Sequence, residues 1–104
     1  MVKRVFITQT EDHRDFSAAR TYGTLVPLVA KEQFPDNYDM IRVRMIMERK
    51  LKTFDPTRDS LLLSGDPILM VAASAAICAQ GVTHFRCLKW DKRERGYFPV
   101  TVTL

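Results

Sequence analysis

Hydrophobic and polar residues follow one another along this chain in segments that have the lengths of strands and helices. Short runs rich in β-branched and aromatic residues predict strands, because such side chains pack well on a pleated surface. Between these runs lie segments whose apolar positions recur every three or four residues, which is typical of a helix with one buried face. The five predicted strands span residues 3–8, 24–29, 60–63, 82–90 and 97–104.

Three helices are predicted between the strands. A short helix follows Asp15 and ends at Gly23, and a longer one runs from about residue 38 to residue 54. The apolar positions of the longer helix form one stripe that should face the core: Met40, Val43, Met47, Leu51 and Phe54.

The third helix, residues 67–80, carries no charge. We therefore expect it to be buried on all sides and to form the centre of the molecule together with the strand before it. The residues expected to be among the least exposed are Leu62, Ile68, Val71, Ala75 and Cys78.

Strands that alternate with helices predict parallel strands joined by right-handed crossovers, and the last two strands, joined by the charged turn DKRERG, predict an antiparallel hairpin. Pro27 and Pro99 cannot donate to a strand ladder, so their strands should lie at the sheet edges. We predict a single α/β domain over residues 1–104. It should be a three-layer sandwich with a mostly parallel five-stranded sheet in the order 2-1-3-4-5, strand 5 antiparallel. In that strand, Phe98, Val100, Val102 and Leu104 should form the buried face.

In an open sheet of this order, ligands bind outside the carboxyl ends of the strands where the chain direction reverses. The residues that meet there are Thr8, Gln9 and Thr10 after the first strand, and Ser64, Gly65 and Asp66 after the third. Small hydrogen-bonding groups beside a helix N-terminus favour a small-ligand or nucleotide site. The same turn is also explained as a helix cap, with Asp66 as N-cap and Pro67 as the first helical residue. Both interpretations stay open.

Candidate catalytic residues are hard to find in this sequence. His13 and His84 have no Cys, His or Glu at the spacing of a metal site, and no GxGxxG or Walker lysine is present. Cys78 and Cys87 lie in apolar segments and are expected to be small buried hydrophobic residues. We therefore expect no catalytic residue, no metal and no cofactor.

The chain is mildly basic, with 16 Lys and Arg against 12 Asp and Glu. One basic surface is predicted on the hairpin, where aromatic and cationic residues alternate: Arg86, Trp90, Lys92, Arg93, Arg95 and Tyr97. Three roles are open for the aromatic pair: it stabilises the hairpin alone, it anchors a protein interface, or it stacks on bases. A second basic stripe, Arg42, Arg49 and Lys52, lies on the longer helix beside the apolar Ile41 and Met45, which favours contact with a partner or a second subunit.

The segments VFITQT, DFSAARTYG, FDPTRDSLLLSGDP and LKWDKRERGYFPVTV together resemble small, uncharacterised proteins encoded by tailed bacteriophages. The resemblance implies a protein of the host cytoplasm and no established catalytic residue. A cytoplasmic localisation also agrees with a first segment that is unlike a secretory leader. The longest apolar stretch is too short for a membrane span, which takes about 20 residues.

The sequence predicts a non-catalytic binding or regulatory protein. We expect it to be a homodimer that acts through the hairpin on a host or phage protein, or on nucleic acid, without contact to a membrane. The alternative is a small-ligand or nucleotide-binding protein that uses the crevice after the first and third strands.

Overall fold

The computed structural model describes residues 2–31 and 39–103. Its centre is a five-stranded sheet in the order β2-β1-β3-β4-β5. β1 pairs in parallel with β2 and β3, β3 pairs in parallel with β4, and β4 and β5 form an antiparallel hairpin. The predicted strand order and directions are confirmed, and Pro27 and Pro99 both lie in edge strands. The bounds are Arg4–Ile7 for β1, Thr24–Pro27 for β2, Ser60–Leu62 for β3, His84–Asp91 for β4 and Gly96–Thr103 for β5.

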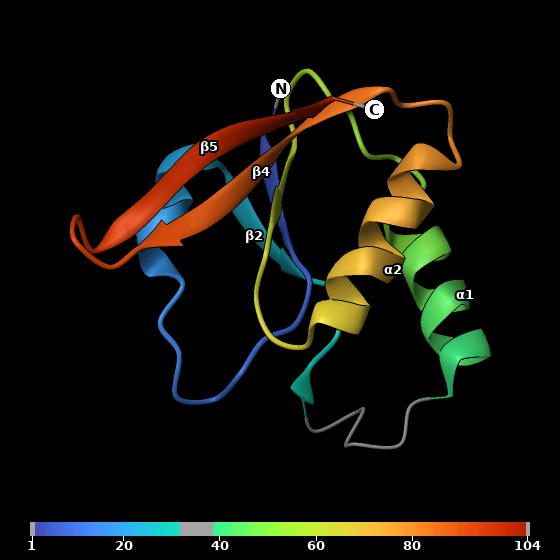
Figure 1. Ribbon diagram of the computed structural model, residues 1–104, viewed down its shortest axis with the longest axis horizontal. Helices are drawn as coiled ribbons and strands as arrows, with labels where there is room; N and C mark the ends of the chain where they lie inside the picture. Colours follow the sequence, from blue (N-terminus) through green and yellow to red (C-terminus); the bar gives the residue numbers. More distant parts are fainter. Residues whose placement is uncertain (1, 32–38, 104) are drawn as a thin grey trace.

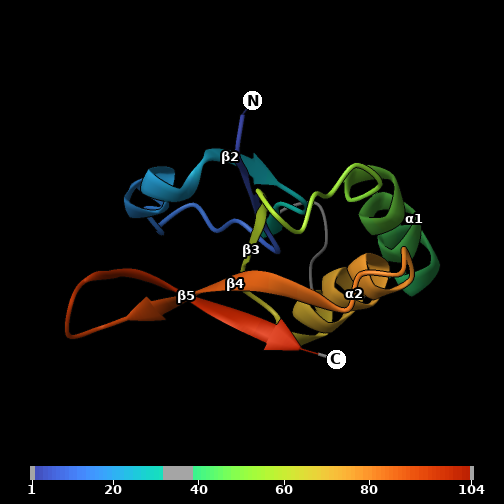
Figure 2. The ribbon, with the colours of Figure 1, turned by 90° about the horizontal axis from the view of Figure 1, so that it is seen from above.

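Helices cover both faces of the sheet, which gives the predicted three layers (Figure 2). The helices α1 (Met40–Lys50) and α2 (Pro67–Cys78) lie on one face, over a core that includes Phe6, Leu61 and Phe85. A short 3-10 helix, η1 (Ser17–Tyr22), lies on the other face, over a smaller core that includes Val5, Ile7 and Leu88. We call these the α face and the η face.

Helix α1 begins one residue after Asp39, whose carboxylate accepts hydrogen bonds from the backbone N–H groups of Ile41 and Arg42 at 3.1 and 3.3 Å. The predicted start at residue 38 lies outside the described residues. Of the predicted core stripe, Val43, Met47, Leu51 and Phe54 are buried, but Met40 is exposed. Met40 borders a hollow whose other wall on α2 consists of alanines, and these are too short to cover it.

The prediction that α2 is buried on all sides is wrong. Its buried residues are Leu69, Ala73, Ala76 and Ile77, and Leu62 of β3 is buried as predicted. Ile68, Val71 and Ala75 are exposed, and Cys78 is only half-buried. α2 packs against α1 and the sheet, and its third side has no neighbour among the described residues. The absence of charge therefore marks an apolar surface here and not complete burial.

The predicted buried face of β5 is also wrong in part. Phe98 and Val100 are exposed and Val102 is half-buried, while Leu104 lies outside the described residues. Their partners across the hairpin, Lys89, Cys87 and Phe85, place these residues on the α face. β5 is the edge strand, and α2 does not extend far enough to cover this part of the sheet (Figure 2).

Candidate functional site

The predicted crevice after β1 and β3 is filled by hydrogen bonds within the protein. Thr8 Oγ1 donates to the Ser64 carbonyl at 2.5 Å and accepts from the Ser64 N–H at 2.9 Å. Gln9 Oε1 accepts from the Asp66 N–H at 2.8 Å, and Arg14 donates to Ser64 Oγ at 3.1 Å. Thr8, Gln9 and Ser64 are buried. The polar groups that were expected to bind a ligand therefore bind one another.

Gly65 lies against Gln9 in this crevice, whereas Thr10 lies outside it. Gly65 has a φ of +82°, and a Cβ at this position would lie 2.5 Å from Gln9 Cβ and closer still to Gln9 Oε1. Thr10 is not part of the cluster, since its N–H donates to the Val29 carbonyl and it pairs with Ala30 beyond the end of β2. A ligand would have to displace Gln9, and the small-ligand site stays a prediction.

The Asp66 carboxylate accepts from the Ile68 N–H at 2.8 Å, and Pro67 opens α2, as expected for a helix cap. Asp66→Ala should lower the free energy of unfolding by about 1 kcal/mol, because the first turn of α2 loses its acceptor. Asp66→Asn is the matched control, since asparagine is an equally good N-cap. It should change the free energy of unfolding by only a few tenths of a kcal/mol. Urea unfolding measures both, and an unchanged stability of Asp66→Ala would contradict the cap.

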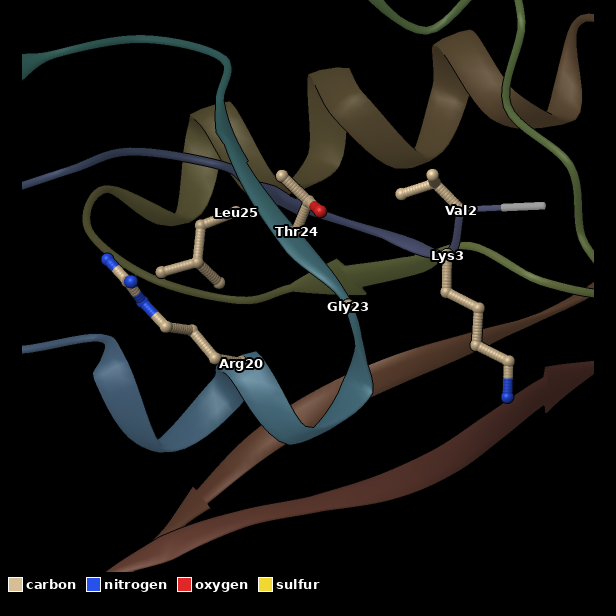
Figure 3. A pocket seen from close by; sticks show the side chains of 6 residues that line it. All are labelled: Val2, Lys3, Arg20, Gly23, Thr24 and Leu25. Atoms are coloured by element: carbon tan, nitrogen blue, oxygen red, sulfur yellow. The ribbon is translucent and has the colours of Figure 1, made fainter.

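A hollow of about 500 Å³ lies beside the start of β2 and is lined by Val2, Lys3, Arg20, Gly23, Thr24 and Leu25. Figure 3 shows that the Lys3 and Arg20 side chains extend in different directions, so that their charged ends do not converge. A specific small-ligand site needs convergent polar groups. We therefore do not place a ligand in this hollow.

The hairpin brings Trp90 and Tyr97 together as predicted. They are direct cross-strand partners on the η face, with ring centroids 5.1 Å apart in an edge-to-face arrangement at 66°. The Tyr97 carbonyl accepts from the Tyr22 hydroxyl at 3.1 Å, which ties the turn end of the hairpin to η1. Trp90 is still 38% exposed. The pair thus stabilises the hairpin and keeps aromatic surface open to solvent.

A pocket of about 360 Å³ lies beside this aromatic pair, and its other wall consists of His13, Arg14 and Asp15 from the loop after β1. Burial raises the pKa of Tyr97, while the nearby Arg14 acts in the opposite direction. The Ser17 N–H, which bonds the Asp15 carboxylate at 2.8 Å, lowers the pKa of Asp15 and keeps it charged. The aromatic pair is therefore bordered by charges of both signs. The sequence alone did not suggest that this loop lies beside Trp90 and Tyr97.

The turn of the hairpin carries three exposed cations, Lys92, Arg93 and Arg95. The Asp91 carboxylate accepts from the Arg93 N–H at 2.9 Å and fixes the start of the turn, and Arg95 has a φ of +50°. Arg86 lies further down β4 and is half-buried, with its guanidinium 3.3 Å from Ser60 Oγ. We define the hairpin site as Trp90, Tyr97, Lys92, Arg93 and Arg95.

The predicted basic stripe is exposed, with Arg42 and Arg49 on α1 beside the exposed Ile41 and Met45. Lys52 is exposed too, but it lies in the turn after α1, because the helix ends at Lys50 and not at residue 54 as predicted. The basic stripe lies at the opposite end of the molecule from the turn of the hairpin (Figure 1). A single small partner would not touch both surfaces, so each has to be tested by itself.

Other chemistry has little support in the part of the chain that the structure describes. No group of three His, Cys, Asp or Glu residues there could hold a metal ion. Burial raises the pKa of the Cys87 thiol to about 11, which leaves it protonated and unreactive near neutral pH. Within residues 2–31 and 39–103, no helix has the length and apolar character that crossing a membrane requires.

Comparison with known proteins places this chain in a phage family. A family model described as "Phage Pam3 gp32-like protein" matches residues 3–104. Neither a search of curated proteins nor a search of solved structures gives a match. The match covers nearly the whole chain and confirms the prediction of a phage-encoded protein. The chain belongs to the Phage Pam3 gp32-like protein family.

Proposed function

We propose that this phage protein is a non-catalytic binding protein that acts in the host cytoplasm on a macromolecular partner. The contact surface is the hairpin site, and the partner is a host or phage protein with acidic residues on its surface. The observation that carries this proposal is the half-exposed pair of Trp90 and Tyr97, held rigidly beside exposed arginines.

The composition of the hairpin site is that of a protein interface. Trp, Tyr and Arg are the residue types that dominate the binding energy of such interfaces, and rigid aromatic side chains lose little entropy on binding. The edge-to-face contact with Tyr97 and the bond from Tyr22 fix the pair before a partner arrives. The pocket beside it is large enough to accept a side chain of the partner.

The charges around the pair favour a protein over nucleic acid. Strands of nucleic acid bind along grooves of cations that follow the phosphates. At the hairpin site, Asp91 and Glu94 alternate with the cations of the turn, and Asp15 borders the aromatic pocket. Mixed charges of this kind suit the mixed surface of a protein better than a uniform row of phosphates.

The test is a capture experiment with the tagged full chain in a lysate of infected host cells, followed by an affinity measurement with the purified partner. Trp90→Ala combined with Arg93→Glu and Arg95→Glu should weaken binding at least about thirtyfold, since a lost anchor residue costs about 2 kcal/mol or more. Circular dichroism should remain unchanged, because the substituted side chains are exposed.

The matched control is Arg49→Glu with Lys52→Glu, which reverses two charges on the basic stripe of α1. It should leave capture intact. Loss of capture in the control alone would move the interface to α1 and contradict the proposal. A steep salt dependence of binding to DNA or RNA, with no protein captured, would identify nucleic acid as the partner instead.

A further inference from the structure

One apolar surface of the molecule remains uncovered after the hairpin site has been assigned. Ile68 and Val71 of α2 and Phe98 and Val100 of β5 are exposed, Val71 to 66% and Val100 to 42%. A hollow of about 410 Å³ lies beside Val71, between α2 and the β4–β5 hairpin, and most of its lining side chains are apolar, among them Cys78, Phe85 and Val102. We call these four exposed residues the α2–β5 face. Extended exposed apolar surfaces of this kind mark interaction sites.

The backbone of β5 is arranged to accept another strand at its free edge. The Leu88 carbonyl accepts from the Leu63 N–H at 3.2 Å, so the backbone of Leu88 points toward β3 and away from β5. Its partner Pro99 therefore points its backbone toward the open edge, where the missing N–H costs no bond to β4. Thr101 and Thr103 share this orientation, because strand residues alternate with a period of two.

We propose that the α2–β5 face and the β5 edge bind a second copy of this chain, with the two β5 strands antiparallel and Thr101 opposite Thr101 of the second copy. This register follows from the edge itself. The Tyr97 carbonyl is already bonded to Tyr22, and Pro99 has no donor, so pairing centred on either residue would lose hydrogen bonds at the axis. With Thr101 at the axis, Pro99 stands opposite Thr103 of the second copy, where only the Pro99 carbonyl can bond. Thr101 offers both a donor and an acceptor.

The same register brings apolar side chains together on the α face. Val100 of one copy stands opposite Val102 of the second copy, and this pair occurs twice about the twofold axis. Cross-strand pairs of β-branched residues stabilise antiparallel sheets. The contact is also isologous, since each copy contributes the same surface, as a closed dimer requires.

Charge favours a second copy at this face and at no other described here. The chain has a net charge of +4, so two copies repel one another wherever their cations meet. β5 and α2 contain no charged residue. The exposed Lys89 on the α face is the partner of Phe98, but it belongs to β4 and therefore lies one strand away from the β5 edge. Arg86, the partner of Thr101 across the hairpin, extends toward Ser60 on β3 and therefore away from the proposed seam. A long uncharged edge strand left open would also be prone to uncontrolled pairing.

The experiment is sedimentation equilibrium of the full chain from micromolar to millimolar concentrations. The wild type should be a dimer. Thr101→Pro should be monomeric, because proline removes the outward donor while the bonds to β4 stay intact, as at Pro99. Val100→Lys should be monomeric as well, since it places a charged side chain opposite Val102 of the second copy on both sides of the axis. Ile41→Lys is the matched control: it adds the same charge at a side chain that is 75% exposed on α1, and it should remain dimeric.

Circular dichroism of each variant shows whether the fold is kept, and Val100→Lys serves if Thr101→Pro does not fold. A monomeric wild type would overturn the inference, as would a dimer that survives both β5 variants. Loss of the dimer in Ile41→Lys alone would place the contact on α1 and overturn it too. The hairpin site takes no part in this contact. A negative capture experiment would therefore contradict the proposed function alone, and a monomeric wild type would contradict the dimer alone.

Discussion

Asp59→Ala is expected to be the most destabilising single substitution in this protein, with a loss of about 3–5 kcal/mol in the free energy of unfolding. Asp59 is 1% exposed, and its carboxylate lies 2.8 Å from the Arg4 guanidinium. It also accepts from the backbone N–H groups of Arg4 at 3.0 Å and Asp55 at 2.8 Å. Alanine removes every one of these acceptors at once, and the half-buried N–H groups of Arg4 and Asp55 lose their partner.

The carboxylate joins the start of β1 to the segment before β3, so its loss affects the two central strands. Asp59→Asn keeps one acceptor oxygen and should cost less than Asp59→Ala. Glu48→Ala is the control: it removes the exposed ion pair with Arg44, also 2.8 Å long, and should cost at most about 0.5 kcal/mol. Urea unfolding monitored through Trp90 measures all three. A loss below that of Glu48→Ala would show that Asp59 has no structural role.

The topology of the sheet was predictable because it depends on local patterns. The alternation of strands with helices predicts parallel crossovers, and prolines that cannot donate to a ladder predict edges. Pro27 and Pro99 lie in the two edge strands, as expected. The caps at Asp66 and Pro67 are similarly local. These inferences need only the geometry of residues close together in sequence.

Predictions that required knowledge of what covers a surface failed. α2 lacks charge, which was interpreted as burial on all sides, but Ile68 and Val71 are exposed. In β5 the alternating apolar residues were interpreted as a core face. Phe98 and Val100 are nevertheless exposed, because α2 does not reach over them. Apolar composition does not distinguish the interior of a domain from a surface that another molecule covers.

The candidate sites show the same division between position and detail. That Thr8 and Ser64 meet at one edge of the sheet follows from parallel strands, but their reciprocal hydrogen bonds depend on side-chain geometry that no pattern reveals. The position of the loop with Arg14 beside the hairpin site follows from the topology of the sheet. β1 and β4 run in the same direction, so the segments at their carboxyl ends, residues 10–15 and Trp90, meet at one edge.

Gly65→Ala and Gly81→Ala form a pair that separates backbone strain from lack of space. Both glycines have positive φ, +82° and +85°, so an L side chain costs about 1–2 kcal/mol at either position. A Cβ at Gly81 meets nothing within 4 Å, whereas a Cβ at Gly65 collides with Gln9. Gly65→Ala should therefore lower the free energy of unfolding by about 2–5 kcal/mol, since a collision in a packed site adds about 1–3 kcal/mol.

The excess loss at Gly65 measures how firmly Gln9 fills the crevice. Gln9 is buried, and its Oε1 accepts from the Asp66 N–H, so moving it also exposes that donor at the start of α2. Chemical unfolding of both variants gives the difference directly. Gln9→Ala combined with Gly65→Ala should recover only part of the added loss, because it removes the contact with Gln9 Oε1 but keeps the Cβ of residue 9, which lies 2.5 Å from the added Cβ. If the two glycine variants lost equal stability, Gln9 would move aside at little cost. The crevice would then open readily enough for the small ligand that the sequence predicts there.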